Sequence, residues 1–86
     1  MPTTRAAERA LRKSLVRRRR NELRKSAIRF WRKEVLRLVQ SGDVEGARRA
    51  FAMFQKAVDK AAIRGAIHPN KAARLKSRLY AQAFGG

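Results

Sequence analysis

Apolar residues recur at helical spacing in the second half of the chain. Between residues 44 and 62 they are separated alternately by three and four positions, which places them along one face of a helix. They are Val44, Ala47, Phe51, Phe54, Val58 and Ala61. Gly42 interrupts the chain beforehand, Asp43 can cap the first free backbone N–H groups, and Gly65 suits a left-handed helix end. The pattern predicts a helix over residues 44–64.

A second apolar stripe lies near the C-terminus. Its members are Ala72, Leu75, Leu79 and Ala83, again three or four positions apart. Pro69 is tolerated at the first position of a helix, and His68 or Asn70 stands near the capping position. These residues predict a helix over 70–83 after a short turn.

The first forty residues predict a longer helix whose two halves differ. No Gly or Pro occurs between Thr4 and Gln40, and good helix formers dominate this stretch. A clear apolar stripe is present only in its C-terminal half, at Ile28, Trp31, Val35 and Leu38. Towards the N-terminus the stripe weakens to Leu11, Leu15 and Leu23. We therefore expect a helix over 4–41, with Trp31 facing the core and Phe30 at the edge of the stripe.

A block of four arginines, Arg17 to Arg20, interrupts the weak half of that stripe. Consecutive residues of a helix are 100° apart, so the block points almost all round the helix and no face at that level can contact an apolar core. At ~1.5 Å per residue the expected helices are ~54, ~30 and ~20 Å long. The sequence thus predicts an all-α fold: one domain over 1–86, a three-helix bundle with a long N-terminal helix projecting beyond it. We expect this arm to be partly disordered until a partner binds.

Charge sets the class of partner. Of 86 residues, 23 are Lys or Arg and 6 are Asp or Glu, which gives a net charge of +17. Residues 1–40 carry a net +11, residues 41–65 a net +2 and residues 66–86 a net +4. A compact chain of this charge repels itself, and nucleic acid is the commonest polyanion that neutralises it. The first and third helices are therefore the expected binding surface, with the second as the supporting element.

The candidate nucleic-acid-binding residues follow from this distribution. A solvated charged face normally interleaves acids with its cations, but only Glu22 and Glu34 do so around the arginine block. The candidates are Arg5, Arg9, Arg12, Lys13, Arg17, Arg18, Arg19, Arg20, Asn21, Arg24, Lys25, Arg29, Lys33, His68, Asn70, Lys71, Arg74, Lys76 and Arg78. For Asn70 a contact to its own backbone is an equal alternative. Asp59 is expected to form an internal ion pair or to face solvent, near Lys56 and Lys60.

Residues for catalysis, metal binding or cofactor binding are not recognisable. Cysteine is absent, His68 is the single histidine, and no glycine-rich phosphate loop or paired carboxylates occur. We therefore expect no enzyme and no cofactor. The longest apolar runs fall short of the ~18 residues of a membrane span, and the N-terminus does not resemble a secretory leader. The sequence favours a protein that acts inside the cell without a membrane or small-molecule partner.

Three motifs carry a family resemblance. They are Gly65-x-Ile67-His68-x-Asn70-Lys71-Ala72-Ala73-Arg74-x-Lys76; Gly42-Asp43 followed by Ala47, Ala50-Phe51, Gln55 and Val58-Asp59; and Asn21, Arg24, Lys25-Ser26, Arg29, Lys33 and Val35. On these residues the chain resembles the S-twenty family of bacterial small-subunit ribosomal proteins. The resemblance implies a three-helix bundle that binds small-subunit ribosomal RNA directly. It also implies a cytoplasmic monomer within the small ribosomal subunit, with other subunit components as further candidate partners.

Some positions depart from the family pattern, and two other classes stay open. Pro69, Phe30, Glu34 and Leu75 stand where the family usually has other residues, which puts individual RNA contacts in question. A nucleoid-type protein that compacts DNA would share the same charge logic. A basic helix on a membrane surface is a weaker alternative, because the arginine block interrupts the apolar face that it would need.

Overall fold

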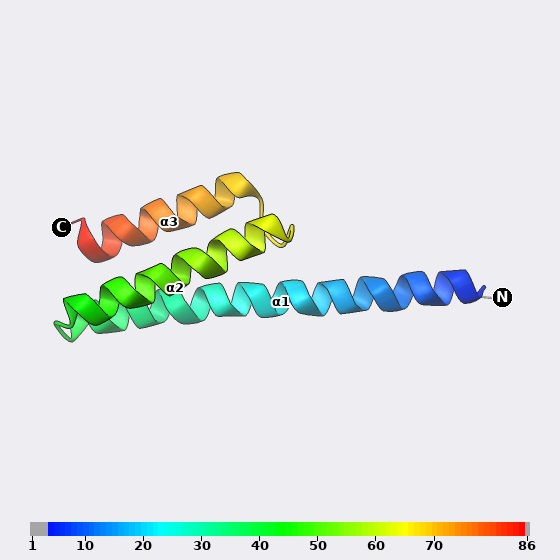
Figure 1. Ribbon diagram of the computed structural model, residues 1–86, viewed down its shortest axis with the longest axis horizontal. Helices are drawn as coiled ribbons and strands as arrows, with labels where there is room; N and C mark the ends of the chain where they lie inside the picture. The colour runs from blue at the N-terminus through cyan, green and yellow to red at the C-terminus, as the bar shows by residue number, and fades with distance from the viewer. Residues whose placement is uncertain (1–3, 86) are drawn as a thin grey trace.

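The computed structural model describes residues 4–85 and consists of three helices in this range. They are α1 (Arg5–Gln40), α2 (Val44–Ile63) and α3 (Pro69–Phe84), joined by two short turns (Figure 1). The expected all-α fold with a long first helix is confirmed. Each helix begins and ends within one residue of the bounds expected from the sequence.

The helix starts are fixed by side chains that accept backbone N–H bonds. Thr4, Asp43 and His68 precede the three helices, and each accepts one bond from the first turn, at 3.2, 2.9 and 3.1 Å respectively. These bonds satisfy donors that have no partner within the helix. Pro69 is the first residue of α3, where its missing N–H costs nothing.

Each of the two corners between successive helices contains a glycine in the left-handed region. Gly42 has φ +83° and Gly65 has φ +79°. At the first corner the Gly42 N–H donates to the Val39 carbonyl at 3.1 Å, and the Asp43 N–H donates to the Leu38 carbonyl at 2.9 Å. The same pair of bonds closes the end of α2, so both helices stop in a Schellman motif. The chain therefore reverses sharply, and successive helices lie antiparallel.

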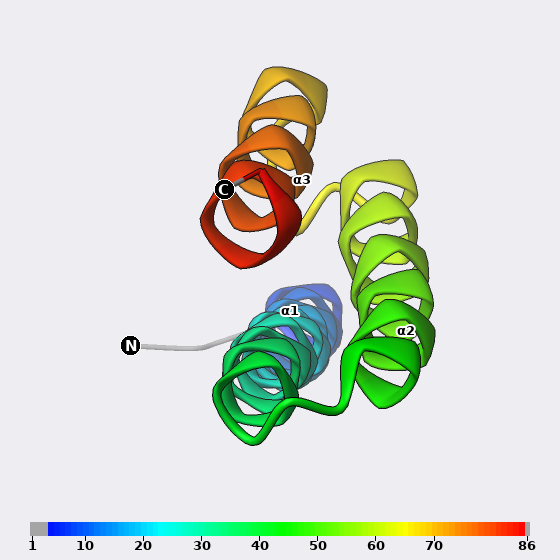
Figure 2. The same ribbon diagram turned by 90° about the vertical axis from the view of Figure 1, so that its left-hand side faces the viewer.

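The helices enclose one thin core. Seen end-on, they occupy the corners of a triangle, with α2 beside α1 and α3 above both (Figure 2). The large side chains that are fully enclosed are Phe54, Leu79, Val35 and Val58, so every helix contributes to the centre. No polar or charged side chain among residues 4–85 is buried, and the core depends on apolar packing.

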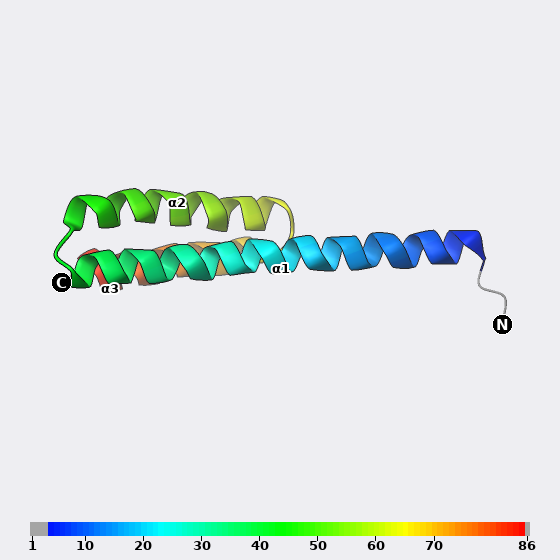
Figure 3. The same cartoon turned by 90° about the horizontal axis from the view of Figure 1, so that it is seen from below.

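The N-terminal half of α1 lies outside the core. The molecule measures 60 × 23 × 16 Å, and its long dimension comes from α1, which extends well past α2 and α3 (Figure 3). Leu11, Leu15 and Leu23 are each more than half exposed. The projecting arm expected from the arginine block is thus confirmed. It is helical from Arg5 onwards, and its ordering by a partner stays a prediction.

The buried face of α2 largely follows the stripe expected from spacing but differs from it at three positions. Ala50, which the stripe omitted, is buried, whereas Val44 is about half exposed. Val44 is the first residue of α2 and directly follows the turn. Phe51 is half-buried and packs edge-on against Phe84, with ring centroids 5.8 Å apart. Because α2 faces both α1 and α3, its buried surface is broader than a single stripe.

Candidate nucleic-acid interface

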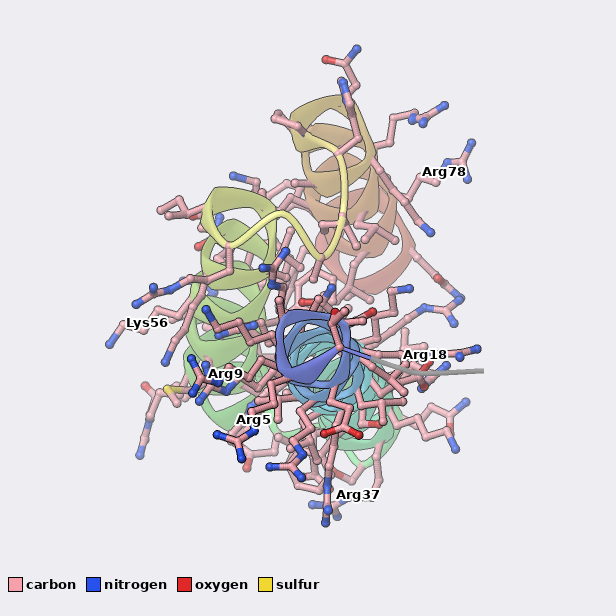
Figure 4. The ribbon with its side chains drawn as sticks, turned by 90° about the vertical axis from the view of Figure 1, so that its right-hand side faces the viewer. Arg5, Arg9, Arg18, Arg37, Lys56 and Arg78 are labelled. Atoms are coloured by element: carbon pink, nitrogen blue, oxygen red, sulfur yellow. The ribbon has the colours of Figure 1, made fainter. Side chains whose placement is uncertain are left out.

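The arm of α1 presents cations on several sides. Arg17, Arg18, Arg19 and Arg20 are all exposed, as are the candidate cations that precede them in α1. In the view along α1, Arg5 and Arg9 project to one side of the axis and Arg18 to another (Figure 4). The arm is therefore a positively charged rod rather than a helix with one basic face, and it can be approached by phosphates from more than one direction.

The bundle brings the basic residues of α1 and α3 together at a cleft. This cleft has a volume of about 160 Å³ and is lined by Lys25, Ile28, Arg29, Ile67, Lys71 and Leu75. Two of its cations come from α1 and the third from α3, which are far apart in sequence. Arg29 also lies 3.5 Å from the Ser26 hydroxyl, to which its guanidinium donates. The fold thus brings basic residues of α1 and α3 to one cleft.

The remaining candidates on α3 fall into two groups. Arg74 and Arg78 are exposed, and Arg78 projects outward from α3 (Figure 4). Lys76 is half-buried, and its Nζ lies 2.8 Å from a carboxylate oxygen of Asp59 on α2. Asp59 therefore pairs with a lysine of α3 rather than with its neighbours on α2. The charge of Lys76 is locally balanced, which makes it a weaker contact candidate than the other two.

His68 and Asn70 lie at the start of α3. His68 is exposed, and its Nδ1 accepts the Asn70 backbone N–H at 3.1 Å. The bond satisfies a backbone donor in the first turn of α3. The Asn70 side chain is exposed beside Lys71. Both residues thus have a structural position at the helix end from which their side chains also face solvent.

One ion pair on α1 involves Arg37, a cation that is not among the candidate residues. The Arg37 guanidinium donates to both carboxylate oxygens of Glu34, at 2.9 and 3.3 Å. This hydrogen bond lowers the pKa of Glu34 below its ordinary value and raises the pKa of Arg37. Glu34 therefore offsets the charge of Arg37, although the side chain of Arg37 is largely exposed and projects from the bundle (Figure 4).

Lys60 is not among the candidates expected from the sequence, although it lies beside two candidate arginines. Lys60 of α2 lines a second cleft together with Arg20 and Arg24 of α1. The segment around α2 has a low net charge, so its lysines were not selected as candidates. The signal that could have found it is the antiparallel pairing of α1 and α2, which brings the end of α2 back to the level of the arginine block.

Within residues 4–85, no three His, Asp or Glu side chains gather closely enough to hold a metal ion. No helix in the same range is long and apolar enough to cross a membrane.

These features define a class: a small helical protein in which a short bundle carries a long, strongly basic helix. Residues 2–83 match the family model described as ribosomal protein S20, and the chain belongs to this family. The resemblance drawn from the three motifs is thereby confirmed.

Individual relatives match over most of their length. The chain is 47% identical over 79 residues to small ribosomal subunit protein bS20 of Thermomicrobium roseum, which covers 92% of this chain and 80% of that relative. It is 43% identical over 82 residues to the bS20 protein of Legionella pneumophila, covering 95% and 93% of the two chains. It is 48% identical over 77 residues to the bS20 protein of Aeromonas hydrophila, covering 90% and 87%.

Proposed function

We propose that this protein is a structural component of the small ribosomal subunit that binds small-subunit ribosomal RNA directly. In this role it acts in the cytoplasm, as one domain and one copy within the subunit, and it performs no catalysis. It stabilises the packing of RNA helices against one another while the subunit assembles. Family membership supports the setting, and the basic surface supports the direct contact with RNA.

The observation that carries the proposal is the basic surface that runs from the arm of α1 to the cleft at Lys25, Arg29 and Lys71. It comprises cations from two helices, and the arm displays them on several sides. RNA helices have a deep, narrow major groove that side chains do not read easily, so contacts to backbone and shape dominate recognition. A rod that offers arginines in several directions suits contact with more than one RNA segment.

The mechanism follows from electrostatics. Phosphates of RNA helices that pack closely repel one another, and this repulsion opposes assembly. Arginine offers a planar fork that can bind phosphate oxygens through two hydrogen bonds. The arm lowers the repulsion where it lies between RNA segments, while the bundle fixes the direction in which the arm points.

A competition experiment tests the proposal. Binding to small-subunit ribosomal RNA is compared with binding to duplex DNA of equal length in buffer containing 150 mM salt and magnesium. We expect a strong preference for the ribosomal RNA, because a protein surface that is complementary to the shape of folded RNA does not fit a uniform DNA duplex. Equal affinity for the two would contradict the proposal and would favour the alternative of a nucleoid-type DNA-compacting protein.

A further inference from the structure

A second cleft lies at the junction between the arm and the bundle. It has a volume of about 300 Å³ and is lined by Arg20, Leu23, Arg24, Ala27, Ala57 and Lys60. Three of these residues are cations, two from α1 and one from near the end of α2, and no acidic residue among residues 4–85 lines the cleft. The other three, Leu23, Ala27 and Ala57, form its apolar lining.

The three cations line one cleft, and their orientation and surroundings bear on what the cleft can bind. Arg24 is half-buried, and its guanidinium donates to the Asn21 side-chain oxygen at 3.4 Å, which restricts its orientation. Lys60 lies in the last turn of α2, where the backbone carbonyls carry a partial negative charge that favours a cation. That effect is too small to offset three like charges that face one cleft. An external anion would remove the repulsion.

We infer that this cleft binds one backbone phosphate of the RNA, with the adjoining ribose against the apolar lining. The inference rests on the proposed function, because it names a contact within the same RNA complex. Arginine guanidinium groups suit two phosphate oxygens, and the lysine ammonium adds a point charge. Leu23, Ala27 and Ala57 give the sugar an apolar surface that a free inorganic ion would leave uncovered.

The position of the cleft explains why it matters for the complex. The bundle ends here and the arm begins, so an RNA strand that follows the arm reaches the cleft next (Figure 1). A phosphate held by α1 and α2 together ties the arm to the bundle through RNA. The second helix is then part of the binding surface as well as its support.

Two lysines of α2 provide a matched test. Lys60 lines the cleft, whereas Lys56, one turn earlier on the same helix, is exposed and projects outward from the bundle (Figure 4). We expect Lys60→Ala to weaken binding to small-subunit ribosomal RNA by roughly fivefold to tenfold, and to lower the slope of log affinity against log salt by about one. Lys56→Ala should leave both values near those of the unaltered protein, and Lys60→Arg should retain most of the affinity.

Lysine footprinting tests the unaltered protein and does not depend on how a variant folds. The complex with ribosomal RNA is treated with an amine-reactive reagent, and labelling at each lysine is measured by mass spectrometry. We expect RNA to protect Lys60 and to leave Lys56 reactive. Equal labelling of the two lysines, or equal losses of affinity in the two alanine variants, would overturn the inference. The proposed function would remain intact as long as the unaltered protein binds ribosomal RNA tightly. Failure of the proposed function itself would appear as a lack of preference for ribosomal RNA in the unaltered protein, and the inference would fall with it.

Discussion

At the scale of single residues, Phe54 and Phe30 are the same side chain in opposite environments. Phe54 is 0% exposed at the centre of the bundle, whereas Phe30 is 55% exposed on the outside of α1. We expect Phe54→Ala to lower the free energy of unfolding by roughly 3–5 kcal/mol, because it removes apolar burial and leaves a cavity. A domain this small has roughly 4–13 kcal/mol in total, so the substitution should remove a large fraction of its stability.

Phe30→Ala is the control for that experiment. Its ring contacts Trp31 edge-on, with centroids 5.0 Å apart, but it does not fill the core. Thermal unfolding followed by circular dichroism should therefore show a much smaller loss of stability for Phe30→Ala than for Phe54→Ala. Similar losses in the two variants would mean that the packing described for α2 is wrong.

The ion pair between Glu34 and Arg37 predicts a dependence on pH. The hydrogen bond from Arg37 lowers the pKa of Glu34 in the folded state. Its contribution to stability is therefore present above the ordinary, unfolded pKa and is lost as pH falls through the folded value. Glu34→Gln should be slightly less stable than the unaltered protein near pH 7, and the difference should vanish in strong acid. The effect is small because both groups contact solvent. Chemical unfolding of the two proteins over a range of pH measures it, and a difference that grows towards acid would contradict the prediction.

At the scale of helices, the arm and the bundle should respond separately to mutation. Replacing Arg17, Arg18, Arg19 and Arg20 with Ala should weaken RNA binding and lower its salt slope by about one for each lost phosphate contact. The same variant should keep α2 and α3 packed, since none of these arginines is buried. Loss of cooperative thermal unfolding in this variant would show that the arm supports the bundle and would refute their independence.

The helix bounds could be predicted from sequence because their signals are local. Asp43 and Gly65 act within one turn of their own positions, and a capping oxygen or a left-handed glycine leaves few alternatives. The arginine block likewise predicted the projecting arm, because four consecutive charges cannot share a buried face. The exposure of Val44 could not be predicted, since it depends on where the corner places the first turn of α2.

The candidate site was only partly predictable, because part of it depends on how the helices pack. Net charge along the chain pointed to α1 and α3, and their residues do meet at one cleft. Pairings between helices could not be read from charge. The charge of Lys76 is offset by Asp59 of α2, and Lys60 lies beside Arg20 and Arg24. Both pairings depend on the axial register of the packed helices.

At the scale of the whole molecule, the net charge of +17 predicts strong sensitivity to salt. With ~6–10 phosphate contacts, the affinity for ribosomal RNA should fall by about 10³–10⁵-fold between 50 and 200 mM salt, by analogy with duplex DNA. Filter binding or fluorescence anisotropy over this range measures the slope. An affinity that hardly changes with salt would exclude electrostatic neutralisation as the mechanism.

The two tight corners also bear on how quickly the molecule acquires its shape. Each corner joins a helix to the next one along the chain, so α1 meets α2 and α2 meets α3 without a long loop to close. Folding rates rise when contacting residues are near in sequence, and small helical bundles of this kind fold in microseconds to milliseconds. The bundle can therefore be complete soon after its last helix has been synthesised. A newly made chain would then meet RNA with its core already buried, and the first interaction between them would be electrostatic attraction.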